Sequence, residues 1–178
     1  MTGTNTIPAN TEIVMDFETY YAADYSLRSM TTIEYILDNR FKVHGASVKI
    51  GSRPAVWMDE HKVRNFIYGL TLANLWNTIT LVGHNLLFDG AILTWHYRAP
   101  PPAQYVDTLG LSRFLIGSQL KSHSLASVYE HLTGTAGKQR AAALEAVKGV
   151  RDLSPQQSAD LGLYAVDDAE ETSFIWEW

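Results

Sequence analysis

The amino-acid sequence predicts an α/β fold in which a mixed β-sheet is flanked by helices and the C-terminal half is helical. The N-terminal part alternates short apolar runs, typical of buried strands, with segments whose apolar residues recur at helical spacing. From residue 109 onwards, helical patterns fill most of the remaining chain. A length of 178 residues suits one domain. We therefore expect a flexible lead over residues 1–10 and a single domain over residues 11–178.

Short apolar segments are expected to form the strands of the sheet. A Gly-Ser-Arg-Pro turn at 51–54 separates two of them and predicts a hairpin. Another apolar run ends at Gly83, where a polar turn follows. The expected strands cover residues 12–17, 43–50, 55–58, 79–82 and 105–107.

The helices are marked by their start and stop signals. Thr31 and Glu34 form a capping-box pattern, and Ser154 and Gln157 form another. The prolines at 100–102 end a helix, because proline cannot continue one. The expected helices cover residues 32–38, 62–74, 87–97 and 155 to near the C-terminus, with further helical segments from 109 and a Gly-containing break near 133–137.

The composition is that of an ordinary globular protein, with 46% hydrophobic residues. No run approaches the roughly 18–20 apolar residues of a membrane span, and residues 1–10 lack the pattern of a signal peptide. The chain has no cysteine, which excludes disulfides, thiolate metal sites and cysteine nucleophiles. We expect a cytoplasmic protein without membrane association. The net charge of −5 counts against tight binding of long duplex nucleic acid by this chain alone.

Acidic residues occur at three places from which they can meet. Asp16 and Glu18 lie two apart at the end of the first expected strand, so both side chains point to the same side of the sheet. Asp89 lies about one turn into the helix after the fourth expected strand, among apolar neighbours. A carboxylate is costly there unless it is paired or binds a metal. Asp168 follows Tyr164 by four residues on the last helix, so the two share one face.

Each of these elements alone has an ordinary explanation. They could be an acidic strand end, a helix-start aspartate favoured by the helix dipole, and a tyrosine packed in the core. Together, in this order and without a competing histidine or cysteine cluster, the carboxylates fit a site for two divalent ions. Mg²⁺ and Mn²⁺ take oxygen ligands. Two such ions about 3.5–4 Å apart can stabilise both the attacking and the leaving oxygen of a phosphoryl transfer.

The segments at 15–19, 82–89 and 164–169 resemble the three exonuclease motifs of the DEDD superfamily. The likeness is closest to the proofreading 3′→5′ exonuclease domain of family A DNA polymerases, including those of phages. Residues 107–109 resemble the Asp-Thr segment between that family's second and third motifs. Tyr164 assigns the chain to the branch with tyrosine, rather than histidine, in the third motif. The resemblance implies a ribonuclease H-like fold, in agreement with the mixed sheet.

The resemblance also implies a role for each acid. Asp16, Glu18 and Asp168 would hold a first metal ion. Asp16 would also hold the second ion, on which Asp89 would act through water. Tyr164 would orient the attacking water, and the product would be a nucleoside 5′-monophosphate.

Four further residues are candidates for contact with the substrate. Phe17, Thr19 and Phe88 flank the acids, and an aromatic ring there could stack on a terminal base. Core packing is the more ordinary role for Phe17. Asn85 matches the asparagine of the second motif, which contacts the substrate strand in the family. The neighbouring His84 stands where the bacterial enzymes often carry another polar residue, so its role stays open.

The implied function is removal of nucleotides from the 3′ end of single-stranded DNA. The implied partner is a DNA polymerase domain or subunit, and a phage-encoded protein would act in the cytoplasm of its bacterial host. One alternative is an RNA-trimming exonuclease of the same branch, similar to ribonuclease D, because the motifs do not separate RNA from DNA. Another is a non-catalytic nucleic-acid-binding module. The presence of all four acids and the tyrosine argues against that module.

Overall fold

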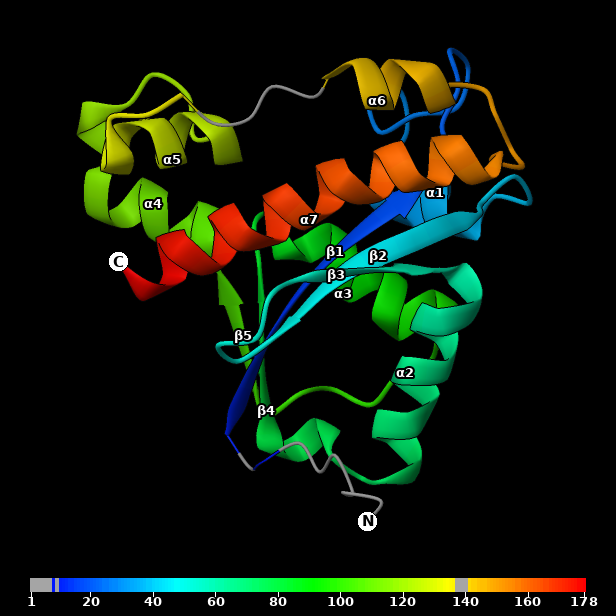
Figure 1. The fold of residues 1–178 in the computed structure, drawn as a ribbon, viewed down its shortest axis with the longest axis horizontal. Coiled ribbons are helices and arrows are strands. Elements are labelled where there is room, and N and C mark those ends of the chain that lie inside the picture. The colour runs from blue at the N-terminus through cyan, green and yellow to red at the C-terminus, as the bar shows by residue number, and fades with distance from the viewer. Residues whose placement is uncertain (1–7, 9, 137–140) are drawn as a thin grey trace.

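The computed structural model describes residue 8, residues 10–136 and residues 141–178. A five-stranded mixed sheet with the strand order β3-β2-β1-β4-β5 forms its centre (Figure 1). The strands are β1 (Thr11–Thr19), β2 (Val43–Ile50), β3 (Val56–Asp59), β4 (Ile79–Gly83) and β5 (Gln104–Asp107). The α-helices are α1 (Thr32–Leu37), α2 (Glu60–Leu72), α3 (Leu86–Ala91), α4 (Thr108–Ile116), α5 (Leu125–Thr133), α6 (Ala141–Val147) and α7 (Pro155–Glu177). Shorter helical turns are η1 (Trp76–Thr78), η2 (Ile92–His96) and η3 (Gly117–Gln119).

The strand directions bring three strand ends to one edge of the sheet. β1 pairs antiparallel with β2 and parallel with β4, and β4 pairs parallel with β5. The carboxyl ends of β1, β4 and β5 therefore lie side by side. Asp16 and Glu18 lie near the end of β1, Asn85 follows β4, and Asp107 ends β5. The mixed sheet predicted from the sequence is confirmed, and its topology gathers the motif residues at this edge.

β1 separates two apolar layers. Met15 and Phe17 belong to the main core, together with buried residues of α1, α2 and η2. Val14 faces the opposite side, where it packs with Val82 of β4 and Ala169 of α7. α7 crosses this second face of the sheet (Figure 1) and contacts β1, β2, β3 and β4. Because side chains alternate along a strand, the residues of β1 on the same face as Val14 point toward α7.

A tryptophan ring and an ion pair hold α7 against the hairpin of β2 and β3. Trp57 of β3 lies between Gly45 of β2 and Gly162 of α7, and a Cβ atom at either glycine would lie 2.5 Å from the ring. The Lys49 ammonium contacts the Glu170 carboxylate at 2.9 Å. Lys49 is only 8% exposed, so this pair is screened less than a surface pair. These contacts fix α7, and with it the third motif, along the sheet.

Both predicted capping boxes are present. Thr31 and Glu34 exchange side-chain and backbone hydrogen bonds at the start of α1, and Ser154 and Gln157 do the same at the start of α7. The predicted hairpin is confirmed, with Gly51 in the turn at a φ of 52°. Local sequence signals therefore define these elements well.

Two helices differ from the prediction. α2 begins at Glu60, before the expected start at residue 62, because the Asp59 side chain accepts a hydrogen bond from the Lys62 amide and caps the helix earlier. The helix expected over residues 87–97 is α-helical only over α3 and continues as the π-helical turn η2. The wider turn changes which side chains after Ala91 share a face.

Two expectations fall partly outside the described residues. The flexible lead expected over residues 1–10 lies outside them, except for Pro8 and Asn10. The expected break near 133–137 begins as predicted, because α5 ends at Thr133 and Gly134 follows with a φ of 69°; residue 137 is not among those described. Among the described helices, none combines the length and apolar character that crossing a membrane requires.

The contact between Trp57 and α7 predicts opposite effects for two glycine substitutions. Gly162→Ala places a methyl group against the ring, and overpacking of this kind costs about 1–3 kcal/mol. This cost outweighs the roughly 1 kcal/mol by which alanine stabilises a helix relative to glycine. The control is Gly69→Ala on α2, where nothing lies within 4 Å of an added Cβ; it should stabilise by about 0.5–1 kcal/mol. Urea unfolding measures both, and equal stability of the two variants would contradict the close contact.

Candidate active site

The first two acids project from β1 toward α7. The β1 residues with odd numbers face the main core, so Asp16 and Glu18 share the α7 face with Val14. Both side chains are partly buried. The pairing of β1 with β2 shifts register between Glu18 and Thr19, so regular pairing ends beside the acids.

Asp89 reaches the same place from α3. It is 4% exposed, and its Oδ1 accepts a hydrogen bond from the Phe17 amide at 3.0 Å. β1 pairs with β4 only from Thr11 to Val14, so the Phe17 amide lies beyond that pairing. Asp89 therefore binds the backbone of β1 between the two acids of the first motif.

Tyr164 and Asp168 approach from α7. Ala165 and Ala169 of this helix are fully buried against the sheet, and their small side chains let the helix lie close to it. The Tyr164 hydroxyl lies close enough to the Asp168 carboxylate to act against the rise of its pKa. The i and i+4 spacing that the sequence predicts thus brings these two side chains together.

The acids raise one another's pKa values, so they share one electrostatic environment. Burial and then the charge of Asp89 raise the pKa of Asp16 to about 8. Burial and then the charges of Asp16, Asp168 and Asp89 raise the pKa of Glu18 well above its usual value. A carboxylate is affected in this way when it is removed from water and placed near like charges.

The other two acids show the same pattern, with partial offsets. Burial raises the pKa of Asp89 to about 7, although its bond to the Phe17 amide favours the ionised form. Burial and the charge of Asp16 raise the pKa of Asp168 to about 7, although the Tyr164 hydroxyl acts in the opposite direction. All four acids therefore hold protons more tightly than free carboxylic acids, and a cation between them would take the place of those protons.

The donor set fits hard divalent ions, although the side chains are not arranged as a finished metal site. Asp16 Oδ2 is buried and lacks a hydrogen-bond partner among the described residues, which is unusual for a carboxylate oxygen. Within the described part of the chain, no three acidic or histidine side chains surround one point closely enough to hold an ion as they stand. Side-chain rotation at this edge would therefore have to accompany binding of a metal.

A cavity of about 370 Å³ opens beside Glu18. Two rings from different segments, Tyr35 of α1 and Phe88 of α3, line it. Arg28, from the loop after β1, lines it as well and is the one basic residue among its lining residues. The remaining lining residues are Phe17, Thr19, Tyr21, Ser26, Leu27 and Leu144. The size and the aromatic walls suit the base and sugar of one terminal nucleotide.

The candidate substrate residues lie differently from one another. Thr19 and Phe88 line this cavity, and the Thr19 hydroxyl bonds the Tyr35 hydroxyl at 2.8 Å. Phe17 is 5% exposed, and its ring stacks on Tyr97 in the core. Asn85 is exposed at the turn before α3.

Sequence reasoning missed several residues of this cavity. Tyr35 and Arg28 belong to the segment after the first motif and carry no local signal, because only the fold brings them to Glu18. Tyr21 donates a hydrogen bond to the Leu144 carbonyl at 2.8 Å, which joins α6 to the cavity wall. A capping box at Thr31 and Glu34 was the one sign that this region is ordered.

The sequence matches no protein-family model, and a comparison with curated proteins finds no match. Solved structures of similar shape are found at low sequence identity. RNase D from Trypanosoma brucei superposes with a TM-score of 0.68 at 15% identity, covering 96% of this chain and 57% of that one. This chain therefore spans little more than half the length of that protein.

Two further structures have the same architecture. Brucella melitensis NrnC bound to pGG gives a TM-score of 0.62 at 16% identity, covering 99% of this chain and 74% of that one. The EXO domain of Aedes aegypti Nibbler gives a TM-score of 0.59 at 9% identity, covering 94% of this chain and 80% of that one. At these identities the likeness establishes the fold. The chain has the ribonuclease H-like fold that the sequence predicts.

The raised pKa values predict how the metal-free protein responds to pH. Unfolded carboxyl groups have pKa values near 4, whereas those of folded Asp16, Asp89 and Asp168 are about 7–8. The protons held in the folded state contribute stability that is fully present below about pH 4 and is lost as the pH rises through about 7–8. In EDTA, the melting temperature should therefore carry a component that falls between about pH 4 and about pH 8.

Asp16→Asn should reduce this component, because it removes one of the repelling charges. Millimolar Mn²⁺ or Mg²⁺ should raise the melting temperature of the wild-type chain by several degrees, and more at high pH, because metal and protons compete for the same oxygens. An unchanged melting temperature in metal at about pH 8.5 would contradict a cation site formed by these acids.

Proposed function

We propose that the chain is a metal-dependent 3′→5′ exonuclease that hydrolyses the terminal phosphodiester bond of single-stranded RNA. The observation that carries the proposal is the meeting of Asp16, Glu18, Asp89 and Asp168 at one sheet edge, where burial and mutual repulsion raise their pKa values. A cluster of carboxylates can promote phosphoryl transfer only when it binds cations. The phosphate of the substrate would help to bind those cations. The product is a nucleoside 5′-monophosphate.

The proposed ligands follow the motif resemblance and the positions of the side chains. Asp16, Glu18 and Asp168 would hold one divalent ion. Asp16 and Asp89 would serve the second ion. When bound, such ions lower the pKa of a coordinated water and stabilise the charge of the leaving oxygen. NrnC from Brucella melitensis has been solved with bound Mg²⁺, which supports Mg²⁺ or Mn²⁺ here.

The remaining residues orient the reacting groups. Tyr164, beside Asp168, would orient the attacking water. Phe88 and Tyr35 enclose the terminal base in the cavity beside Glu18. Thr19 lines the same cavity. Phe17 contributes through its backbone amide, which fixes Asp89, rather than through its ring.

RNA is favoured over DNA by the proteins that share the fold. RNase D from Trypanosoma brucei has been solved with GMP and with the RNA U12, and NrnC with pGG. Single-stranded DNA, with a DNA polymerase as partner, is the second candidate. Its support is the resemblance of the three motifs to proofreading domains.

Digestion of 5′-labelled single-stranded RNA and DNA, side by side in Mn²⁺, tests the proposal. We expect a ladder that shortens from the 3′ end, and faster loss of RNA. Asp16→Ala should lower the rate by roughly 10³-fold or more, because it removes the ligand common to both ions, worth several kcal/mol. The same variant should still fold and bind the strand. Full activity of Asp16→Ala would exclude this site, and faster loss of DNA would favour the second candidate.

Tyr164→Phe separates orientation of water from binding of metal. The substitution keeps the ring and removes the hydroxyl, so turnover should fall by about 10²-fold through loss of alignment. The rise in melting temperature with Mn²⁺ should persist, because the carboxylates remain. Loss of that rise, or turnover equal to the wild-type value, would contradict the role given to Tyr164.

A further inference from the structure

The turn between β4 and α3 carries Asn85 in an unusual conformation. Asn85 has a φ of 67° and a ψ of 46°, in the left-handed region, where residues other than glycine are uncommon. It stands at the N-cap position of α3, yet its side chain makes no capping hydrogen bond. The first amides of a helix need partners. Another part of the chain must therefore supply them.

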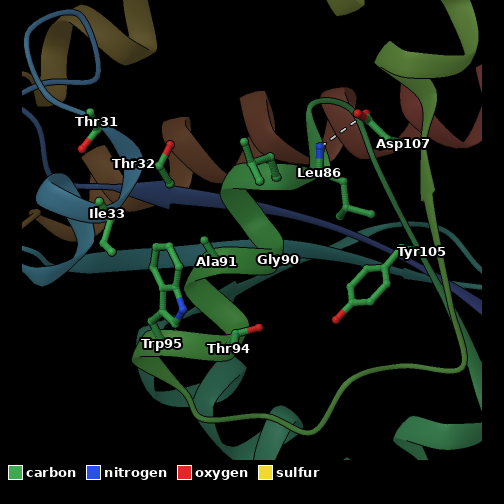
Figure 2. Close-up of a pocket in the computed structure, with 11 residues that line it drawn as sticks. Thr31, Thr32, Ile33, Leu86, Gly90, Ala91, Thr94, Trp95, Tyr105 and Asp107 are labelled. Atoms are coloured by element: carbon green, nitrogen blue, oxygen red, sulfur yellow. Dashed lines mark hydrogen bonds between the residues drawn. The ribbon is translucent and has the colours of Figure 1, made fainter.

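Asp107 at the end of β5 supplies them. Its Oδ1 accepts hydrogen bonds from the Asn85 amide at 2.9 Å, the Leu86 amide at 3.4 Å and the Leu109 amide at 3.1 Å. Figure 2 shows the bond between Asp107 and Leu86, with the cavity of about 740 Å³ on the outer side of α3. The register of β4 and β5, which pairs Gly83 with Asp107, brings the carboxylate to this turn. The side-chain carboxamide of Asn85 is thus free of hydrogen bonds to the described residues.

A second set of bonds fixes the residue before Asn85. The Thr108 side chain contacts the Gly83 carbonyl at 3.2 Å and His84 Nδ1 at 2.9 Å. His84 Nε2 lies 2.9 Å from the His123 carbonyl oxygen, which can only accept, so Nε2 is the donor. The turn is therefore held on both sides of Asn85 by β5, α4 and the loop before α5.

We propose that Asp107, Thr108 and His84 are positioning residues. They hold Asn85 so that its free side-chain carboxamide contacts the sugar–phosphate backbone of the substrate strand. This inference rests on the proposed function, because it assumes a nucleic-acid strand at the site. It gives His84 a role and explains Asp107, an acid that lies near the four clustered carboxylates without belonging to them. Asp107 acts by accepting hydrogen bonds, so its charge is dispensable.

The role of the charge can be separated from the role of the hydrogen bonds. Burial, and to a smaller extent the charge of Asp107, raises the pKa of Asp89, and a negative charge here also repels phosphate. Asparagine at position 107 keeps an acceptor oxygen and loses the charge, whereas alanine loses both. Asp107→Asn should therefore retain the wild-type KM within about twofold, and Asp107→Ala should not.

The test is a double-mutant cycle of Asp107→Ala and Asn85→Ala. Each single variant should raise KM for a 5′-labelled single-stranded RNA about tenfold, with a smaller change in kcat. The double variant should be no worse than Asn85→Ala, because Asp107 acts through Asn85. Additive effects of the two substitutions, or an Asp107→Asn variant as impaired as Asp107→Ala, would overturn the inference.

A binding measurement and an alternative variant keep the outcome unambiguous. The same cycle is measured by fluorescence anisotropy as the Kd of the labelled strand in Mn²⁺, on an Asp16→Ala background that should bind without cleaving. A wild-type chain that binds but does not cleave would then overturn the proposed function alone, and a chain that does not bind would overturn both. If Asp107→Ala does not fold, Thr108→Val replaces it, because it removes the hydroxyl that holds His84. The coupling to Asn85→Ala is expected to be the same, and its absence would reject the inference.

Discussion

The confinement of four carboxylates away from water is the constraint on which the rest of the structure depends. Burial and like charge both disfavour ionisation of Asp16, Glu18, Asp89 and Asp168. The hydrogen bond from the Phe17 amide to Asp89, and the Tyr164 hydroxyl close to Asp168, offset only part of this cost. Protons or cations must offset the remainder. The site is thus a region of stored electrostatic energy that the surrounding fold has to hold in place.

Each acid comes from an element that other contacts fix independently. β1 lies in the middle of the sheet and carries two of the acids. α7 is held by Trp57 and by the ion pair of buried Lys49 with Glu170, two residues beyond Asp168. α3 is held at its first turn by a carboxylate of the neighbouring strand. Repulsion at the sheet edge therefore acts on rigid elements, and the side chains rather than the backbone are free to adjust. Such support from outside the site is what a strained functional site needs.

Local patterns in the sequence were sufficient for the elements and insufficient for their contacts. The alternation in β1 placed Asp16 and Glu18 on one face, and the spacing of Tyr164 and Asp168 placed those two side chains on one face of α7. The partner of Asp89 could not be foreseen, because the Phe17 amide is free only where β4 stops pairing with β1. Arg28 of the loop after β1 and Tyr35 of α1 line the cavity only because the fold brings this segment to Glu18. The capping of α3 by Asp107 required the strand order, which no local signal contains.

The charge of the chain and the geometry of its site together bear on the substrate. With a net charge of −5, the protein as a whole repels a polyanion at long range, which on the proposed function weakens binding of a long nucleic acid. On the proposed function, attraction of the strand would have to come from cations, the Asn85 side-chain carboxamide and Arg28. These groups would lie beside a cavity the size of one nucleotide. On the proposed function, recognition is therefore concentrated at the 3′ end. An enzyme of this kind recognises the end of a strand rather than its length. Binding of metal and binding of the strand are then one linked equilibrium.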